Sequence, residues 1–153
     1  MGKLLCQGIV VLVFIGIALT AFAANPDDIV GVWNTEKNEA KVDIYKCADK
    51  YCGKIVWLKE PDYPSGSTEG TPGTPKTDYK NPNPAVRSGT IMGLTFMRDF
   101  AYTGDNEWKE GKLYDPETGK TYSGKIRLAS SRELHLRGFI GISLIGRTSK
   151  WTR

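Results

Sequence analysis

Two runs of alternating apolar residues, separated by a short connection and bracketed by cysteines, most restrict how this chain can fold. The stretch Gly31 to Leu58 reads GVWNTEKNEAKVDIYKCADKYCGKIVWL, and only residues 48–50 separate the two runs. Apolar residues at every second position indicate a half-buried strand, and so short a connection makes the two strands antiparallel neighbours. The stretch therefore predicts a β-hairpin with Cys47 and Cys52 beside its turn.

The hydrophobic pattern also predicts how the two cysteines lie. If Cys47 is opposite Cys52, one face of the hairpin is entirely apolar, because side chains alternate between faces. That face carries Val42, Ile44, Ile55 and Trp57, with Val42 opposite Trp57. The cysteines then lie on the outer face, where we expect a disulfide that fixes the register. A redox motif fits poorly, because it needs two residues between its cysteines. A zinc site also fits poorly, because it needs more Cys or His ligands than Cys47, Cys52 and the single His135 provide.

The rest of the chain repeats this pattern of short segments with alternating apolar residues, bounded by Gly, Pro, Asn and Asp. Hairpin-like connections make consecutive segments antiparallel neighbours, and closure into a barrel removes exposed sheet edges. We therefore predict an all-β fold, an antiparallel up-and-down barrel of about eight strands. The expected strands are Ile29–Thr35, Glu39–Cys47, Tyr51–Leu58, Gly89–Arg98, Glu107–Tyr114, Thr121–Ala129, Glu133–Phe139 and Leu144–Arg153.

A proline-rich segment from Lys59 to Ser88 interrupts the strands after the third one. Proline removes the backbone donors that a ladder needs, so this segment is predicted to be a long loop. Its second part, DYKNPNPAVR, carries Asx residues that can bond nearby amides and prolines that fix φ, which predicts an ordered turn. We leave open whether this turn is a plain connector or a binding loop or lid. Its candidate residues are Asp78, Asn81, Asn83 and Arg87.

Alternation also names the side chains expected to point into the barrel. The candidate interior ligand-binding residues are Trp57, Met92, Leu94, Phe96, Tyr122 and Ile126. Gly124 and Gly138 fall on the same inward face; they either let the walls approach each other or leave space for a guest molecule. Arg137 falls on the opposite face and is expected to be a solvated charge. The sequence does not decide between a ligand cavity and a filled core.

The N-terminus predicts export. A positive Lys3, an apolar run from Ile9 to Leu19 and the small-residue site ending at Ala23 form the pattern of a signal peptide spanning residues 1–23. The remaining residues, 24–153, suit one domain with no membrane span, in the periplasm of a Gram-negative bacterium or secreted. The 21 basic and 17 acidic residues are interspersed, without the basic cluster that nucleic acid binding requires.

Several motifs together resemble known families. Gly31-Val32-Trp33 in the first strand and Arg147 and Arg153 in the last resemble the lipocalin and wider calycin signature, in which a tryptophan packs under an arginine at the closed end of the barrel. The segments CGKIVWL, NPNPAVR, GKLYDPETGKTYSGKI, LRGFIG and LIGRTSKWTR resemble a family of small exported bacterial proteins of unknown function with a lipocalin-like barrel. The resemblance implies the fold, with Trp33 and one of the two arginines as closure residues.

No catalytic constellation is predicted. His135 is the single histidine, GISLI lacks the final glycine of a nucleophile elbow, and the Asx-rich turn lacks the spacing of a calcium loop. We expect no enzyme activity, no cofactor and no metal. The first functional hypothesis is a barrel that binds a small apolar or amphipathic molecule inside. The alternative is a filled barrel without a small-molecule ligand, whose surface interacts with a protein or with the cell envelope, for example with an envelope protein.

Overall fold

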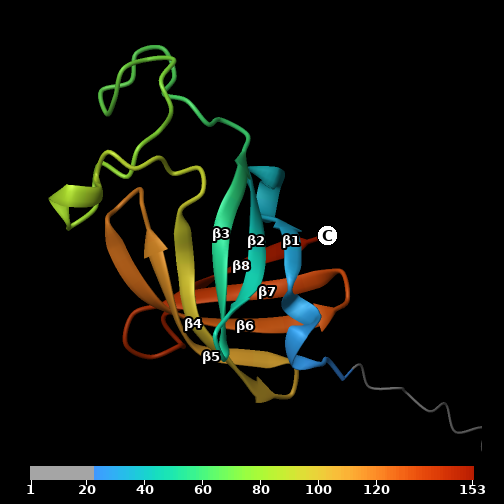
Figure 1. Cartoon of the computed structure of the whole chain (residues 1–153). Helices are drawn as coiled ribbons and strands as arrows, with labels where there is room; N and C mark the ends of the chain where they lie inside the picture. The colour runs from blue at the N-terminus through green and yellow to red at the C-terminus, as the bar shows by residue number, and fades with distance from the viewer. Residues whose placement is uncertain (1–22) are drawn as a thin grey trace, which may run out of the picture.

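The computed structural model describes residues 23–153, which form a closed antiparallel barrel (Figure 1). Each strand pairs with the next along the chain, and Asn34 opposite Thr152 joins the first strand to the last. The predicted up-and-down barrel is confirmed; the predicted signal peptide lies outside the described residues except for Ala23. Within residues 23–153, no helix has the length and apolar character needed to cross a bilayer. The strands are β1 (Gly31–Asn34), β2 (Ala40–Cys47), β3 (Lys50–Leu58), β4 (Thr95–Gly104), β5 (Glu107–Asp115), β6 (Lys120–Ser130), β7 (Glu133–Phe139) and β8 (Gly146–Thr152).

The antiparallel order divides the connections between the two ends of the barrel. One end, the closed end, has the segment before β1, the tight β2–β3, β4–β5 and β6–β7 turns, and the C-terminus. The other end, the mouth, has the β1–β2 connection with η2 (Glu36–Asn38), the long β3–β4 loop with η3 (Pro84–Val86), the β5–β6 turn and the β7–β8 loop. All the longer connections therefore lie at the mouth.

A short 3-10 helix, η1 (Pro26–Ile29), plugs the closed end. Ile29 is fully buried, and the Trp33 indole Nε1 donates to its carbonyl oxygen at 2.8 Å. The Trp108 indole donates to the Pro26 carbonyl at 3.2 Å. Two buried tryptophans thus hold the plug by hydrogen bonds, which satisfies carbonyls that the helix itself leaves open.

Arg153 closes this end from outside. Its guanidinium carbon lies 4.3 Å from the centroid of the Trp33 ring, within cation–π range. The same guanidinium donates to the carbonyl oxygens of Asp28 and Val30, each at 2.9 Å. The closure arginine that the sequence left open is therefore Arg153, and Arg147 has a different place.

The Cys47–Cys52 disulfide is present, but the predicted hairpin register is wrong by two residues. Cys47 pairs with Lys50 and Cys52 with Tyr45, so the disulfide crosses the ladder diagonally. The turn contains two residues, 48–49, instead of the predicted 48–50, and Ala48 has φ 57°, the left-handed conformation favoured in two-residue hairpin turns. An even shift leaves the side chains from Val42 to Ile55 on their predicted faces, and both cysteines are on the outside.

Trp57 is on the outer surface, which corrects its assignment to the interior. A β-bulge at Val56 separates the Val42–Ile55 pair from the Lys41–Trp57 pair, so Trp57 shares the outer face with Lys41. The Trp57 side chain is 40% exposed, and the Lys41 ammonium lies 5.6 Å from the ring centroid. The extra residue reverses the alternation on which the prediction depended.

The fourth strand begins six residues later than predicted, at Thr95 instead of Gly89. Its inward side chains are Met97, Phe100 and Tyr102, with a bulge at Asp99, whose φ is 64°. The bulge breaks the period of two within β4, whereas Met92 and Leu94, which precede β4, alternate with Phe96 and so suggested an earlier start. Met92 and Leu94 precede β4 and lie in the loop.

We predict that replacing both Cys47 and Cys52 with Ser lowers the free energy of unfolding by roughly 2 kcal/mol, because the bond closes a very short loop. Urea unfolding followed by tryptophan fluorescence measures this loss. The near-ultraviolet circular dichroism spectrum should stay unchanged, and an unfolded double variant would contradict the view that the disulfide acts only locally.

Candidate ligand site at the mouth of the barrel

The half of the barrel toward the closed end is filled by side chains. Phe100 is fully buried at its centre, and glycines on neighbouring strands make room for its ring. A Cβ at Gly111 would lie 2.3 Å from the ring, and one at Gly124 would lie 2.8 Å from it. These distances are too short for real atoms, so the walls approach each other here and leave no space for a guest.

The half toward the mouth is open. Gly138 continues the inward face of β7 after Leu134 and Leu136, yet a Cβ placed on it would meet only Leu113, at 3.4 Å, an ordinary van der Waals contact. Gly124 therefore lets the walls approach each other, whereas Gly138 leaves space. The boundary between filled and open barrel lies between these two glycines.

Two adjoining cavities occupy the mouth. The first has a volume of about 400 Å³ and an apolar floor formed by Val42, Ile55, Phe96 and Trp151. The second has a volume of about 570 Å³ and an apolar wall formed by Tyr122, Phe139, Ile140 and Ile145. Asp115 and Arg147 line both cavities, so the two meet in the middle of the mouth. Each volume falls in the usual range for small-molecule sites.

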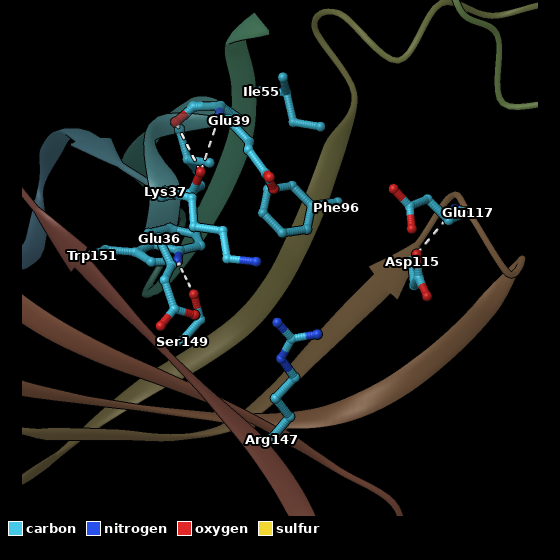
Figure 2. Close-up of a pocket in the computed structure, with 13 residues that line it drawn as sticks. Glu36, Lys37, Glu39, Ile55, Phe96, Asp115, Glu117, Arg147, Ser149 and Trp151 are labelled. Atoms are coloured by element: carbon cyan, nitrogen blue, oxygen red, sulfur yellow. Dashed lines mark hydrogen bonds between the residues drawn. The ribbon is translucent and has the colours of Figure 1, made fainter. Parts of the chain in front are cut away.

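Arg147 is the charged group that extends into this space. It pairs with Gly138 across the β7–β8 ladder, four pairs from the buried Trp151, and so belongs to the inward series of β8. Figure 2 shows its guanidinium reaching between Lys37 and the turn that carries Asp115 and Glu117. Among the described residues, no hydrogen bond or ion pair holds this guanidinium.

The rim of the mouth carries charges of both signs. Asp115 is committed to its own turn, because its carboxylate accepts from the Glu117 amide at 3.0 Å and from the Thr118 hydroxyl at 2.7 Å. Lys37 stands across the mouth from this turn (Figure 2). The mouth thus combines an apolar floor, a polar rim and one inward cation. The acidic rim residues are Glu36, Glu39, Asp115 and Glu117.

The structure brings together part of the predicted interior set. Phe96 and Tyr122 line the mouth cavities, and Ile126 is 1% exposed in the filled core behind them. Met92 is 38% exposed on the long loop, and Leu94 lines a shallow groove on the outer wall; assigning these two to the interior was wrong for the reason given for β4. The role of Phe96 and Tyr122 toward a ligand stays a prediction.

The Asx-rich turn of the long loop is anchored to the outside of the barrel. Asp78 is 2% exposed; its carboxylate accepts from the Tyr114 hydroxyl and from the Asn81 side-chain amide, each at 2.6 Å. The Asn81 carbonyl accepts from Arg87 Nε at 2.7 Å, and the Asn83 amide donates to the Asn81 side chain at 2.9 Å. The four predicted residues thus form one network, and none of them lines the two mouth cavities.

The mouth includes residues that the sequence analysis missed. Ser149 and Trp151 line the first cavity, with the Trp151 indole donating to the Ser149 hydroxyl at 3.0 Å. The alternation Arg147, Ser149, Trp151 was visible in the last predicted strand and would have placed all three inward. Arg137 is not a free solvated charge: its guanidinium donates to the Ser143 carbonyl at 2.7 Å and shapes the β7–β8 loop.

The described part of the chain contains no cluster of three or more His, Cys, Asp or Glu side chains that could bind a metal ion. His135 pairs with Glu133 at 3.0 Å on the outer face, far along β7 from the mouth. The mouth therefore offers a ligand apolar contact, the Arg147 guanidinium, the Tyr122 hydroxyl and a rim with Lys37 and four carboxylates.

We predict that Tyr114→Phe releases the Asx-rich turn. Burial and the hydrogen bond to Asp78 raise the pKa of Tyr114 to about 12, so the hydroxyl is a donor at neutral pH. Its removal leaves a buried carboxylate short of one partner, which costs about 1–3 kcal/mol. Hydrogen exchange of the amides at 78–89 should accelerate. Tyr45→Phe is the control, since that hydroxyl makes only a 3.3 Å bond to Thr95; equal acceleration in both variants would contradict the anchor.

Comparisons with known proteins agree with this barrel. A solved structure from Helicobacter pylori, described as a protein that belongs to the lipocalin family, superposes with a TM-score of 0.67, is 24% identical and covers 81% of each chain. At this identity the likeness concerns the fold. No curated protein matches the chain.

The sequence profile of a bacterial family described as uncharacterized, DUF2147, matches residues 31–153. The match begins at the first strand of the barrel and runs to Arg153, so it spans every strand and the mouth. The protein is a member of this uncharacterized bacterial family, with a lipocalin-like barrel.

Proposed function

We propose that the protein binds a small amphipathic molecule in the mouth of its barrel. The observation that carries this proposal is an apolar floor beside the inward Arg147, whose guanidinium has no hydrogen-bond or ion-pair partner among residues 23–153. Burying apolar surface supplies roughly 25 cal/mol per Å², and the two adjoining cavities offer a guest such surface on both sides of Arg147. The lipocalin-like fold supports the proposal, since small barrels of this kind hold ligands at their mouths.

The chemistry of the mouth favours an anionic head group. Arg147 can donate several hydrogen bonds in a planar fork, which suits a carboxylate or a phosphate. The Tyr122 hydroxyl lines the same cavity and can orient that group. An apolar tail then lies on the floor formed by Phe96 and Trp151. The guest enters only the open half, because the filled core begins at Gly124.

We predict that the protein binds laurate more tightly than dodecanol, which has the same tail without the charge. Arg147→Ala should weaken laurate binding about fivefold, the equivalent of roughly 1 kcal/mol for an exposed charge pair, and leave dodecanol binding unchanged. Isothermal titration calorimetry measures both. Arg132→Ala is the matched control, because Arg132 is an exposed arginine in the β6–β7 turn at the closed end.

A second variant tests the position of the guest. Gly138→Leu should fill the mouth and weaken laurate binding at least tenfold, while the free space at Gly138 lets the barrel fold normally. Trp57→Ala, outside the barrel, should change nothing. Undiminished binding to the Gly138 variant, or tighter binding of dodecyltrimethylammonium than of laurate, would contradict the proposed site.

We propose in addition that the chain is exported and that residues 24–153 are the mature protein. The disulfide supports this, because such bonds persist in oxidising compartments. Mass spectrometry of protein recovered from the periplasm should give the mass of chain 24–153 with the disulfide closed. A mass that includes residues 1–23, or a free thiol pair, would contradict export with cleavage.

One observation supports the alternative function, interaction through the surface of the barrel. The β7–β8 loop exposes four aliphatic side chains at the rim of the mouth, with exposed fractions of 60–85%. The loop is compatible with a ligand site, since two of these side chains also line the second cavity.

A further inference from the structure

We propose that the β7–β8 loop, residues 140–145, inserts into the surface of a lipid bilayer and so holds the mouth of the barrel against the membrane. This goes beyond ligand binding and does not depend on it. The first observation is that the loop exposes a group of aliphatic side chains. Single exposed aliphatic residues are ordinary, but a contiguous group marks a contact surface. The exposed fractions are 69% for Ile140, 60% for Ile142, 85% for Leu144 and 71% for Ile145.

The backbone of the loop is held in a defined shape. The Arg137 guanidinium donates to the Ser143 carbonyl at 2.7 Å and to the Leu144 carbonyl at 3.2 Å. The Ile145 amide donates to the Ile142 carbonyl at 3.2 Å, which closes a turn. A third Arg137 nitrogen donates to the Thr148 hydroxyl at 2.9 Å, which ties the arginine to β8. The aliphatic side chains therefore project from a built turn.

These hydrogen bonds favour lipid as the occupant. A carbonyl that leaves water for hydrocarbon loses its solvent partners and needs an internal donor. The protein already supplies internal donors to the carbonyls of Ile142, Ser143 and Leu144. These three carbonyls can thus leave water with little polar penalty.

The composition of the loop points the same way. Besides its aliphatic residues it contains only Gly141 and Ser143, with neither an aromatic ring nor a charge. Energetic centres of protein interfaces are rich in Trp, Tyr and Arg, and a standard interface uses about 20–30 residues on each side. Four aliphatic side chains on one loop suit a fluid hydrocarbon better than a shaped protein partner.

Insertion has a geometric consequence for the mouth. Ile140 and Ile145 line the second cavity, whereas Ile142 and Leu144 do not. A bilayer that receives the loop therefore adjoins the opening of the cavity, and an apolar molecule could pass between them without crossing bulk water.

Vesicle sedimentation tests the proposal with protein recovered after export, its N-terminus checked by mass spectrometry. The protein should sediment with phosphatidylcholine vesicles, and high salt should not release it, because the contact is apolar. Ile142→Ser combined with Leu144→Ser should weaken partition at least tenfold, since both lost side chains are aliphatic. The matched control combines Val32→Ser with Val86→Ser, two side chains that are 48% and 47% exposed elsewhere; it should partition like the parent.

Three outcomes would overturn the proposal: no sedimentation of the parent, equal sedimentation of the loop variant, or binding that requires phosphatidylglycerol and disappears in salt. Light scattering tests whether a second copy of the protein, instead of lipid, covers the loop. A dimer of the parent that the loop variant loses would assign the loop to a second copy and also overturn it. Laurate affinity separates this test from the ligand site, because the loop variant retains the whole lining of both cavities.

Discussion

Closure of the barrel by Arg153 is the constraint on which the rest of the structure depends. The first strand is only four residues long and meets the last through a single residue pair, so the ladder itself holds the seam weakly. Arg153 adds contacts that hold this seam together. It covers the Trp33 ring and bonds the carbonyls of Asp28 and Val30, which ties the C-terminus to both the plug and the first strand. The antiparallel order then places all the longer connections at the other end, the mouth.

The same closure gives the barrel a filled half and an open half. At the closed end, the plug and the indoles of Trp33 and Trp108 leave no entrance. In the middle, Phe100 occupies the space that Gly111 and Gly124 vacate. Beyond it lie the two mouth cavities, with their apolar floor and Arg147. The site is thus a cup at one end of the barrel, and its depth is set by one phenylalanine.

The sequence predicted the topology because the constraint there is periodic. Alternating segments, short connections and the bracketed hairpin gave the strand order, the disulfide and the long loop. It failed where one extra residue breaks the period: the bulge at Val56 moved Trp57 outside, and the bulge at Asp99 interrupted the alternation within β4. Bulges carry no strong composition signal, so alternation alone could not place them.

The candidate site was only half predictable for a related reason. Tyr122 was found by alternation, and Phe96 was named although its strand was misplaced, but Gly124 and Gly138 are indistinguishable in sequence. What separates them is the three-dimensional position of Phe100, which belongs to a strand that the sequence misplaced. Arg137 was likewise read as solvated, because its partners are backbone carbonyls of a loop and not side chains.

The four tryptophans allow one direct measurement of where the guest lies. Each indole N–H gives its own signal in a ¹H–¹⁵N spectrum, and the rings report on the closed end (Trp33, Trp108), the outer wall (Trp57) and the mouth (Trp151). Titration with laurate should move the Trp151 signal in a saturable way and leave the other three in place. A shift of Trp33 or Trp108 would place the guest in the half described here as filled, and no shift of Trp151 at saturating laurate would contradict a binding site at the mouth.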